Sequence, residues 1–316
     1  MGIAIGIGIA EFPFASAEAY WRWVGIAEAG GIDSIWQTDR LVSRVPFLEC
    51  IATMAALAGA TRRLKFGMNV ASVGLRDPLL LAKQCATIDF LSGGRILPAF
   101  GIGNRLAPDW SATGRSTKAR GKRTDEGLEI ITRLWAGEAV TFDGEFYQYD
   151  GATIAPLPAN KRIPLWIGGS SEAAIRRIAR FGTGWQGASE PVAEVPGIVA
   201  RIREVSRAAG RPVPEDHYGA SFPFRFGGWN EPVARKAAEA FQARFARDPR
   251  QTMAVGDAGT VVEKLEAFVA AGVSKFILRP IGGDDEDILG QTQRLIDEVL
   301  PWLDAANAKQ KQAALA

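Results

Sequence analysis

Histidine and cysteine are scarce in this chain. Its 316 residues include one histidine, His217, and two cysteines, Cys50 and Cys85. This scarcity argues against a zinc site and against hydrolases that use Ser-His or Cys-His pairs, so we predict no metal. Both cysteines lie in apolar, helix-like patterns. We therefore expect buried thiols in a reducing compartment, and we expect the protein to be cytoplasmic.

Long apolar runs and a strong charge of one sign are also missing. No run of 18 apolar residues occurs, and the apolar first ten residues lack the basic start of a signal peptide. The 37 basic and 35 acidic residues give a net charge of +2. This balance argues against nucleic acid or a membrane as a partner and leaves a small organic molecule as the expected substrate.

The common nucleotide-binding and nucleophile motifs are absent. Neither the phosphate-binding loop of ATPases nor the Gly-x-Ser-x-Gly turn of esterases occurs. Residues 182–187 match Gly-x-Gly-x-x-Gly by letter, but these glycines lie before and inside a predicted strand. A dinucleotide site needs them between a strand and a helix, so we interpret this segment as a tight turn.

What the chain does have is a regular alternation of strand and helix patterns. Eight such units favour a closed (β/α)8 barrel over the alternative, an open doubly wound sheet. The predicted strands cover residues 2–10, 33–37, 63–70, 95–101, 164–167, 183–187, 218–226 and 275–280. The predicted helices cover 16–30, 46–60, 78–91, 124–135, 171–180, 194–209, 232–245, 257–272 and 288–303.

The alternation is interrupted after the fourth strand. Residues 106–119 are polar and irregular, and residues 140–149 predict a hairpin around Asp143-Gly144. We expect this insertion to contribute a lid and a hairpin to one domain over residues 1–305. The segment 306–316 is expected to be a disordered tail.

The fifth unit carries the clearest candidate for a binding site. An apolar run, 164–167, leads into Gly168, Gly169, Ser170 and Ser171, and a helical pattern follows. Glycines let a ligand approach the backbone, and the amides of a helix N-terminus attract anions. The turn therefore favours a phosphate site, although an ordinary strand-to-helix turn is the alternative.

In a barrel, chemistry is found where the strands end. Arginine is common at these positions, and its planar guanidinium suits phosphate and carbonyl oxygens, although each one could be a structural ion pair. The strand ends are Glu11, Asp39, Arg40, Ala71, Ser72, Asn104, Arg105, the turn 168–171, Trp185, Arg225 and Arg279. Few classical acids, bases or nucleophiles are among them, which suits a site where a cofactor supplies the chemistry.

Four stretches together resemble the bacterial luciferase-like superfamily of flavin-dependent oxidoreductases along nearly the whole chain. They are DSIWQTDR (33–40), DPLLLAKQCATIDFLSGGRILPAFGIG (77–103), RTDEGLEIITRLWAGEAVTFDGEFY (123–147) and PLWIGGSSEAAIRRIARFGTGW (164–185). The resemblance implies an (α/β)8 barrel that binds a flavin at the carboxyl ends of its strands. It also implies a homodimer.

The resemblance assigns expected roles to individual residues. It implies that the turn formed by Gly168, Gly169, Ser170 and Ser171 holds the cofactor phosphate. It also implies that a bulge with a non-proline cis peptide around Ala71-Ser72 contacts the flavin ring. Asn104 matches a position that meets the flavin, and we add Trp185 to the cofactor contacts. Relatives with a catalytic histidine after strand two have it near Asp39-Arg40. Arg40 stands there instead, so we take Arg40 and Asp39 as the catalytic candidates.

The resemblance leaves the cofactor and the reaction open. We favour a monooxygenase that uses reduced FMN, supplied by a flavin reductase, and O2, because no basic cluster suited to an acidic coenzyme tail stands out. The alternatives are hydride transfer with the deazaflavin coenzyme F420, a non-catalytic flavin-binding barrel, and a lyase or isomerase that binds a phosphorylated substrate at the turn.

Overall fold

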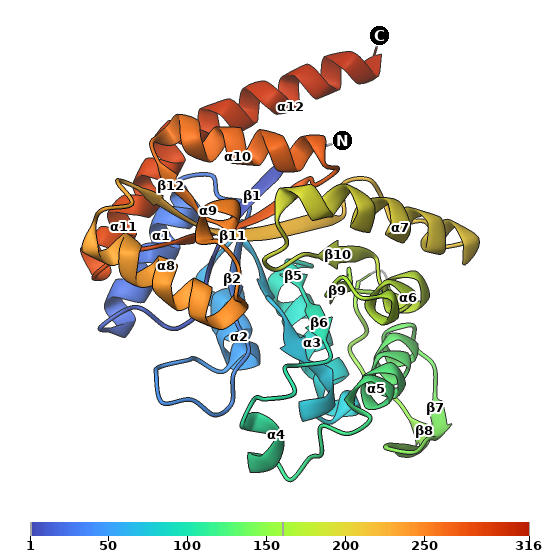
Figure 1. The fold of residues 1–316 in the computed structure, drawn as a ribbon. Coiled ribbons are helices and arrows are strands. Elements are labelled where there is room, and N and C mark those ends of the chain that lie inside the picture. Colours follow the sequence, from blue (N-terminus) through green and yellow to red (C-terminus); the bar gives the residue numbers. More distant parts are fainter. Residues whose placement is uncertain (1, 160, 316) are drawn as a thin grey trace.

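The computed structural model describes residues 2–159 and 161–315 (Figure 1). Its strands are β1 Ala4–Ile9, β2 Ser34–Gln37, β3 Lys65–Met68, β4 Ala71–Ser72, β5 Ile96–Leu97, β6 Ala99–Gly101, β7 Val140–Asp143, β8 Gln148–Ala152, β9 Trp166–Gly168, β10 Gly184–Gln186, β11 Tyr218–Phe226, β12 Ala254–Gly256 and β13 Lys275–Pro280. Its α-helices are α1 Ala17–Ala29, α2 Cys50–Ala60, α3 Pro78–Ser92, α4 Asp109–Ala112, α5 Arg120–Trp135, α6 Glu172–Phe181, α7 Val195–Ala208, α8 Pro232–Phe245, α9 Pro249–Thr252, α10 Ala258–Ala270, α11 Asp285–Arg294 and α12 Leu300–Leu315.

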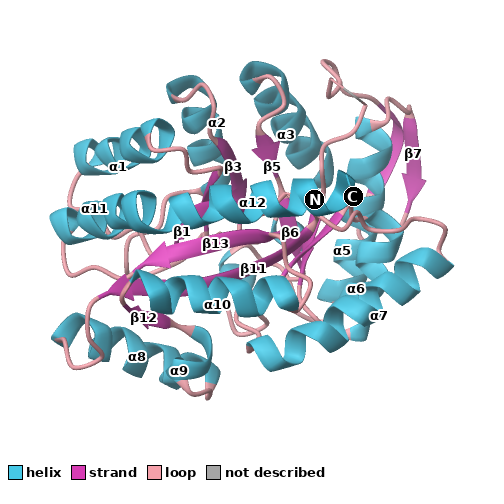
Figure 2. Cartoon of the chain, turned by 90° about the horizontal axis from the view of Figure 1, so that it is seen from above, coloured by secondary structure: helices cyan, strands magenta, loops and turns pink. Residues whose placement is uncertain are grey.

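The parallel strands close into a barrel, as the sequence predicts. Hydrogen bonding follows the order β4-β6-β9-β10-β11-β13-β1-β2-β3-β5, with β12 paired to β11. The two ends of this path meet, because β4 continues β3 and β6 continues β5 along the chain. Helices surround the strands when the barrel is seen from above (Figure 2). The antiparallel pair β7–β8 forms the predicted hairpin outside the barrel.

Several predicted boundaries are wrong, each for a local reason. Strand 95–101 divides at Pro98, which has no N–H for the ladder but accepts a bond from the Trp166 amide at 3.0 Å. Strand 63–70 divides at a cis peptide between Asn69 and Val70. Helix α2 begins at Cys50, not at residue 46, because the Glu49 carboxylate caps the amide of Ala52.

The end of the chain also differs from the prediction. Residues 288–303 divide between α11, a π-helical turn over Leu295–Val299 and α12. Helix α12 continues to Leu315, through most of the segment expected to be disordered. The Asn307 side chain fixes this helix to the first strand, since it accepts from the Ile3 amide at 2.7 Å and donates to the Ile3 carbonyl at 3.0 Å. One domain over residues 1–305 stays a prediction.

The inside of the barrel is filled by two tryptophans. Trp36 and Trp166 form a buried cluster with Ala99 and Ile277, and strand residues facing them are glycines. A Cβ atom on Gly67 would overlap the Leu97 carbonyl and lie 2.5 Å from the Trp36 ring. The rings therefore block the middle of the barrel and leave its two ends for ligands.

This packing predicts that Gly67→Ala destabilises the protein. The added methyl group has no free space, and overpacking of this kind costs about 1–3 kcal/mol of unfolding free energy. Urea unfolding measures the change. Gly197→Ala is the control, because Gly197 lies in α7 with nothing within 4 Å of its Cβ position, and Ala there should stabilise by up to about 1 kcal/mol. Equal stability of the two variants would contradict the packing argument.

Candidate active site

The fifth strand-to-helix turn has the geometry of an anion site. Strand β9 ends at Gly168, Gly169 has a φ of +101°, and Ser171 caps α6 by accepting from the Ala174 amide at 3.3 Å. The positive φ disfavours any residue with a side chain. Helix α6 therefore points its free N-terminal amides toward the end of β9, where the sequence predicts the phosphate site.

A cavity of about 80 Å³ lies beside this turn. Its wall includes Gly168, Gly169 and Ser171 from the turn and Thr124 and Leu128 from α5. The Thr124 hydroxyl is fully buried and has no hydrogen-bond partner in the described part of the chain. Because buried polar atoms are rarely left unpaired, this hydroxyl indicates a polar ligand in the cavity.

Arg177 adds positive charge to the same wall. Its guanidinium contacts Asp125 at 2.5 Å and is largely buried, with 11% of the side chain exposed. This ion pair holds α6 against α5. The donor set around the cavity, consisting of backbone amides, a hydroxyl and a guanidinium, fits a phosphate group.

Trp185 supports the turn and does not line the cavity. Its side chain is fully buried, and its indole N–H donates to the Gly169 carbonyl at 3.0 Å. Trp185 therefore fixes the orientation of Gly169 from behind the turn, and its direct contact with the cofactor stays a prediction.

The cis peptide lies two residues before the predicted position. It joins Asn69 to Val70, whereas the sequence predicts it around Ala71-Ser72. Val70 reaches the ends of two other strands: a Cβ on Gly101 would lie 2.8 Å from its side chain, and one on Gly168 would lie 2.9 Å from it. The third, fourth and fifth strands therefore meet at Val70, next to the turn.

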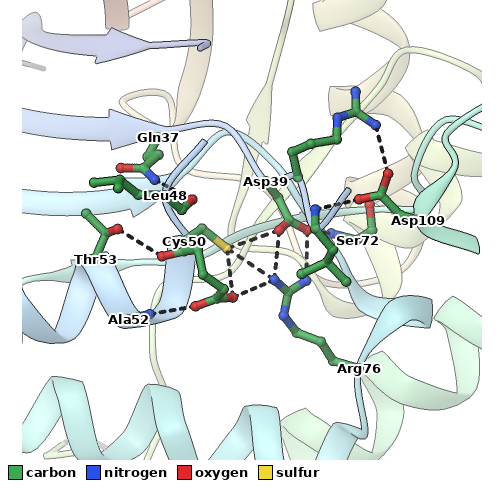
Figure 3. A network of polar contacts seen from close by, with 12 residues as sticks. Gln37, Asp39, Leu48, Cys50, Ala52, Thr53, Ser72, Arg76 and Asp109 are labelled. Atoms are coloured by element: carbon green, nitrogen blue, oxygen red, sulfur yellow. Dashed lines mark hydrogen bonds and ion pairs between the residues drawn. The ribbon is translucent and has the colours of Figure 1, made fainter. Parts of the chain in front are cut away.

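Asp39 is the centre of a buried ion-pair network (Figure 3). Its carboxylate binds Arg76 through both guanidinium nitrogens, at 2.7 and 2.8 Å, and accepts from the Ser72 amide at 2.9 Å. Only 2% of the Asp39 side chain is exposed. With these partners Asp39 positions the backbone next to the cis peptide, and its catalytic role stays a prediction.

Asp39, Glu49 and Cys50 lie close enough together to suggest a cation site. Arg76 already supplies the positive charge, since it also binds Glu49 at 2.7 Å. Burial, followed by the charge of Asp39, raises the pKa of the Cys50 thiol well above its ordinary value. Because Arg76 is paired with both carboxylates, we interpret the group as an ion-pair network, and the absence of a metal stays a prediction.

Arg40, the other catalytic candidate, connects strand β2 to the irregular segment after strand β6. It contacts Asp109 at 3.3 Å, and Asp109 also accepts from the Leu41 amide at 2.6 Å. Burial raises the pKa of Asp109, but the Leu41 amide and Arg40 outweigh it and the pKa is lowered. The carboxylate therefore stays charged and holds α4 against the end of β2.

Asn104 begins the same irregular segment. Its side-chain oxygen accepts from the Leu106 amide at 2.9 Å, and its carbonyl accepts from the Trp110 indole at 3.0 Å. These bonds shape the loop, so the predicted contact of Asn104 with the flavin stays a prediction.

Sequence reasoning missed Thr124 and Val70, because an isolated threonine or valine has no signal until the fold brings it to the turn.

Family comparison agrees with this geometry. The sequence profile of the family described as luciferase-like monooxygenase matches residues 13–249. The chain belongs to the luciferase-like family. Among its relatives is the uncharacterised protein Rv0940c of Mycobacterium tuberculosis, which is 35% identical over 170 residues, 54% of this chain and 58% of that protein. The chain thus aligns with little more than half of that relative's length.

Two longer matches cover nearly the whole chain. The F420-dependent glucose-6-phosphate dehydrogenase of Nocardia farcinica is 26% identical over 292 residues, 89% of this chain and 83% of that enzyme. The crystal structure of monooxygenase RslO1 from Streptomyces bottropensis superimposes with a TM-score of 0.81 at 20% identity, and the match covers 95% of this chain and 99% of that one. The structural match, at this identity, supports the barrel fold. Within the described residues, no helix is long and apolar enough to cross a membrane.

The Asp39 network predicts that Arg76→Leu is strongly destabilising. The substitution leaves a buried carboxylate without its cation, which costs about 3–5 kcal/mol of unfolding free energy. Urea unfolding at neutral pH measures it. The matched control is Arg22→Leu, which breaks a pair with Glu286 whose side chains are 53% and 71% exposed, and which should cost at most about 1 kcal/mol. Similar costs for the two variants would show that the network is not a structural anchor.

Proposed function

We propose that this protein is an oxidoreductase that transfers a hydride between the deazaflavin coenzyme F420 and a small organic substrate. In this proposal the amides of Gly168, Gly169, Ser170 and Ser171 bind the coenzyme phosphate, together with the Thr124 hydroxyl. Val70, which lies beside Gly101 and Gly168 at the carboxyl ends of the strands, would support the ring system. When bound, the coenzyme supplies the redox chemistry, and the chain's own residues bind it, orient it and exclude water.

The observation that carries the proposal is a basic segment next to the phosphate cavity. Residues 115–123 include five cations and no acid: Arg115, Lys118, Arg120, Lys122 and Arg123. The segment leads directly into Thr124, which lines the cavity. Lys122 pairs with Glu145, but the other four have no ion pair with any residue that the structure describes.

These free cations favour the deazaflavin coenzyme over FMN. Beyond its phosphate the deazaflavin coenzyme carries a tail of glutamates, whereas FMN ends at the phosphate. The sequence analysis favours FMN because it finds no basic cluster suited to such a tail, and it overlooks the five cations of residues 115–123. The dehydrogenase that matches 89% of the chain is F420-dependent, while the monooxygenase structure, at 20% identity, supports the fold alone.

The residues around the ring would act by holding nearby backbone and loop segments in place. Asp39 and Arg76 hold the Ser72 amide, and Arg40 holds the irregular segment 102–119 that we expect to cover the substrate. The FMN-dependent monooxygenase with a partner reductase is the second candidate, and a non-catalytic flavin-binding barrel is the third. A homodimer and a cytoplasmic location stay predictions.

The direct test is to titrate the purified protein with the deazaflavin coenzyme and with FMN while following coenzyme fluorescence. We expect tight binding of the deazaflavin coenzyme, weaker binding of FMN, and loss of both in Gly169→Asp, which places a carboxylate at the phosphate position. Circular dichroism checks that this variant folds. Tight binding of FMN without the deazaflavin coenzyme would reverse the assignment, and normal binding in Gly169→Asp would place the phosphate elsewhere.

The basic segment gives a second prediction. In Lys118→Gln/Arg120→Gln we expect the glutamate-bearing coenzyme to bind roughly three- to tenfold more weakly at low salt, because exposed charge pairs are weak and screened. A coenzyme form without glutamates should be affected less. Lys309→Gln/Lys311→Gln removes the same charge from exposed positions on α12 and should change neither affinity. Equal effects on both coenzyme forms would refute a role for the segment in binding the tail.

A further inference from the structure

The inner face of β13 carries an arginine directly above the tryptophan-filled middle of the barrel. Side chains alternate along a strand, and Ile277 packs inward against Trp36 and Trp166. Arg279, two residues further on, therefore also faces inward, about 7 Å closer to the carboxyl end of the barrel. Its strand neighbour in register on β11 is Pro223, and it is partly buried.

Arg279 differs from the other arginines at the strand ends. Arg225 is held by Glu231 at 2.7 Å, by Asp287 at 2.8 Å and by the Ile281 carbonyl at 2.8 Å. Arg40 forms an ion pair with Asp109. Arg279 makes no hydrogen bond or ion pair with any residue that the structure describes. A guanidinium in such a place needs an anion to offset the cost of its burial.

The charges around Arg279 do not supply that anion. Burial, and then the positive charge of Arg244, lower the pKa of Arg279 to about 10. Arg244 lies in the last turn of α8, and its own pKa is lowered by partial burial and by Arg40, with Glu11 acting in the opposite direction. No acid is among the charges that shift the pKa of Arg279.

A buried hydroxyl lies on the neighbouring strand. Ser221 is 3% exposed, and its Oγ has no hydrogen-bond partner in the described part of the chain. Side chains two residues apart on a strand face the same side. A Cβ on Gly219 would lie 3.2 Å from the Trp166 ring inside the barrel, so Ser221, like Pro223, also faces inward. An unpaired cation and an unpaired hydroxyl therefore lie on adjacent strands of the same inner wall.

We propose that Arg279 binds an anionic group of the substrate, either a carboxylate or a phosphoryl group. The proposal rests on the proposed function, since it places the substrate opposite the coenzyme. Around the barrel, two strands, β10 and β11, separate β13 from β9 in one direction, and more strands separate them in the other. The subsite therefore lies across the mouth of the barrel from the phosphate turn. The planar guanidinium can hold two oxygens at once and fix the orientation of the substrate.

Isothermal titration of the full-length protein without coenzyme tests the proposal, with inorganic phosphate and acetate as probes. We expect two phosphate sites in the unmodified protein. Gly169→Asp should abolish binding at the turn, and Arg279→Gln should abolish binding at the subsite. In the Gly169→Asp background, Arg279→Gln should weaken phosphate binding roughly ten- to 100-fold, the range for a lost charge-assisted hydrogen bond. Arg279→Lys keeps the charge and should lose less.

Controls separate the proposed subsite from charge in general. Arg235→Gln removes an exposed cation from α8 and should leave both probes unaffected, and thermal unfolding checks that Arg279→Gln is folded. Binding of acetate as well as phosphate at the subsite supports a carboxylate or phosphoryl substrate, and binding of phosphate alone supports a phosphoryl substrate. Unchanged phosphate affinity in the Arg279→Gln/Gly169→Asp protein overturns the proposal.

The same experiment distinguishes this proposal from the proposed function. If phosphate binding depends on Arg279 but the deazaflavin coenzyme does not bind, the subsite stands and the coenzyme assignment fails. If the coenzyme binds and Arg279→Gln changes nothing, the assignment stands and the subsite fails.

Discussion

The packing of two indole rings inside the barrel is the constraint on which the rest of the structure depends. Trp36 and Trp166 fill the space that eight strands enclose, and glycines on the facing strands make room for them. Because a Cβ at several of these glycines would collide with an indole, strand pairing and interior packing are fixed together. The filled middle confines ligands to the ends of the barrel, and the family places its chemistry at the carboxyl end.

Two polar arrangements shape that carboxyl end. Asp39 and Arg76 hold the backbone at Ser72, which keeps Val70 against the ends of β6 and β9. Trp185, from behind, holds the Gly169 carbonyl. Both arrangements are buried and hydrogen-bonded, so they stabilise a fixed surface on which a planar coenzyme can rest while its phosphate reaches the N-terminus of α6.

Charge at the mouth of the barrel divides into structural and unpaired groups. Arg76, Arg225 and Arg177 are each matched by carboxylates and connect elements of the fold. Four cations of the basic segment, Arg115, Lys118, Arg120 and Arg123, and Arg279 on the opposite wall have no such partners in the described chain. An anion would be stabilised at both places, and we propose the coenzyme for the first and the substrate for the second.

The sequence by itself determined the barrel and the hairpin and predicted a phosphate site at the turn 168–171, because strand and helix periodicity, glycine turns and caps are local signals. Residues 218–226, 232–245 and 275–280 were predicted with the boundaries that the structure has. It could not locate the break at Asn69-Val70 or the start of α2, which depend on contacts with other strands and on one capping side chain. Only the tertiary structure brought residues 115–123 to the turn at 168–171 and decided which arginines have partners. Such pairings join residues far apart in the chain, and no local pattern encodes them.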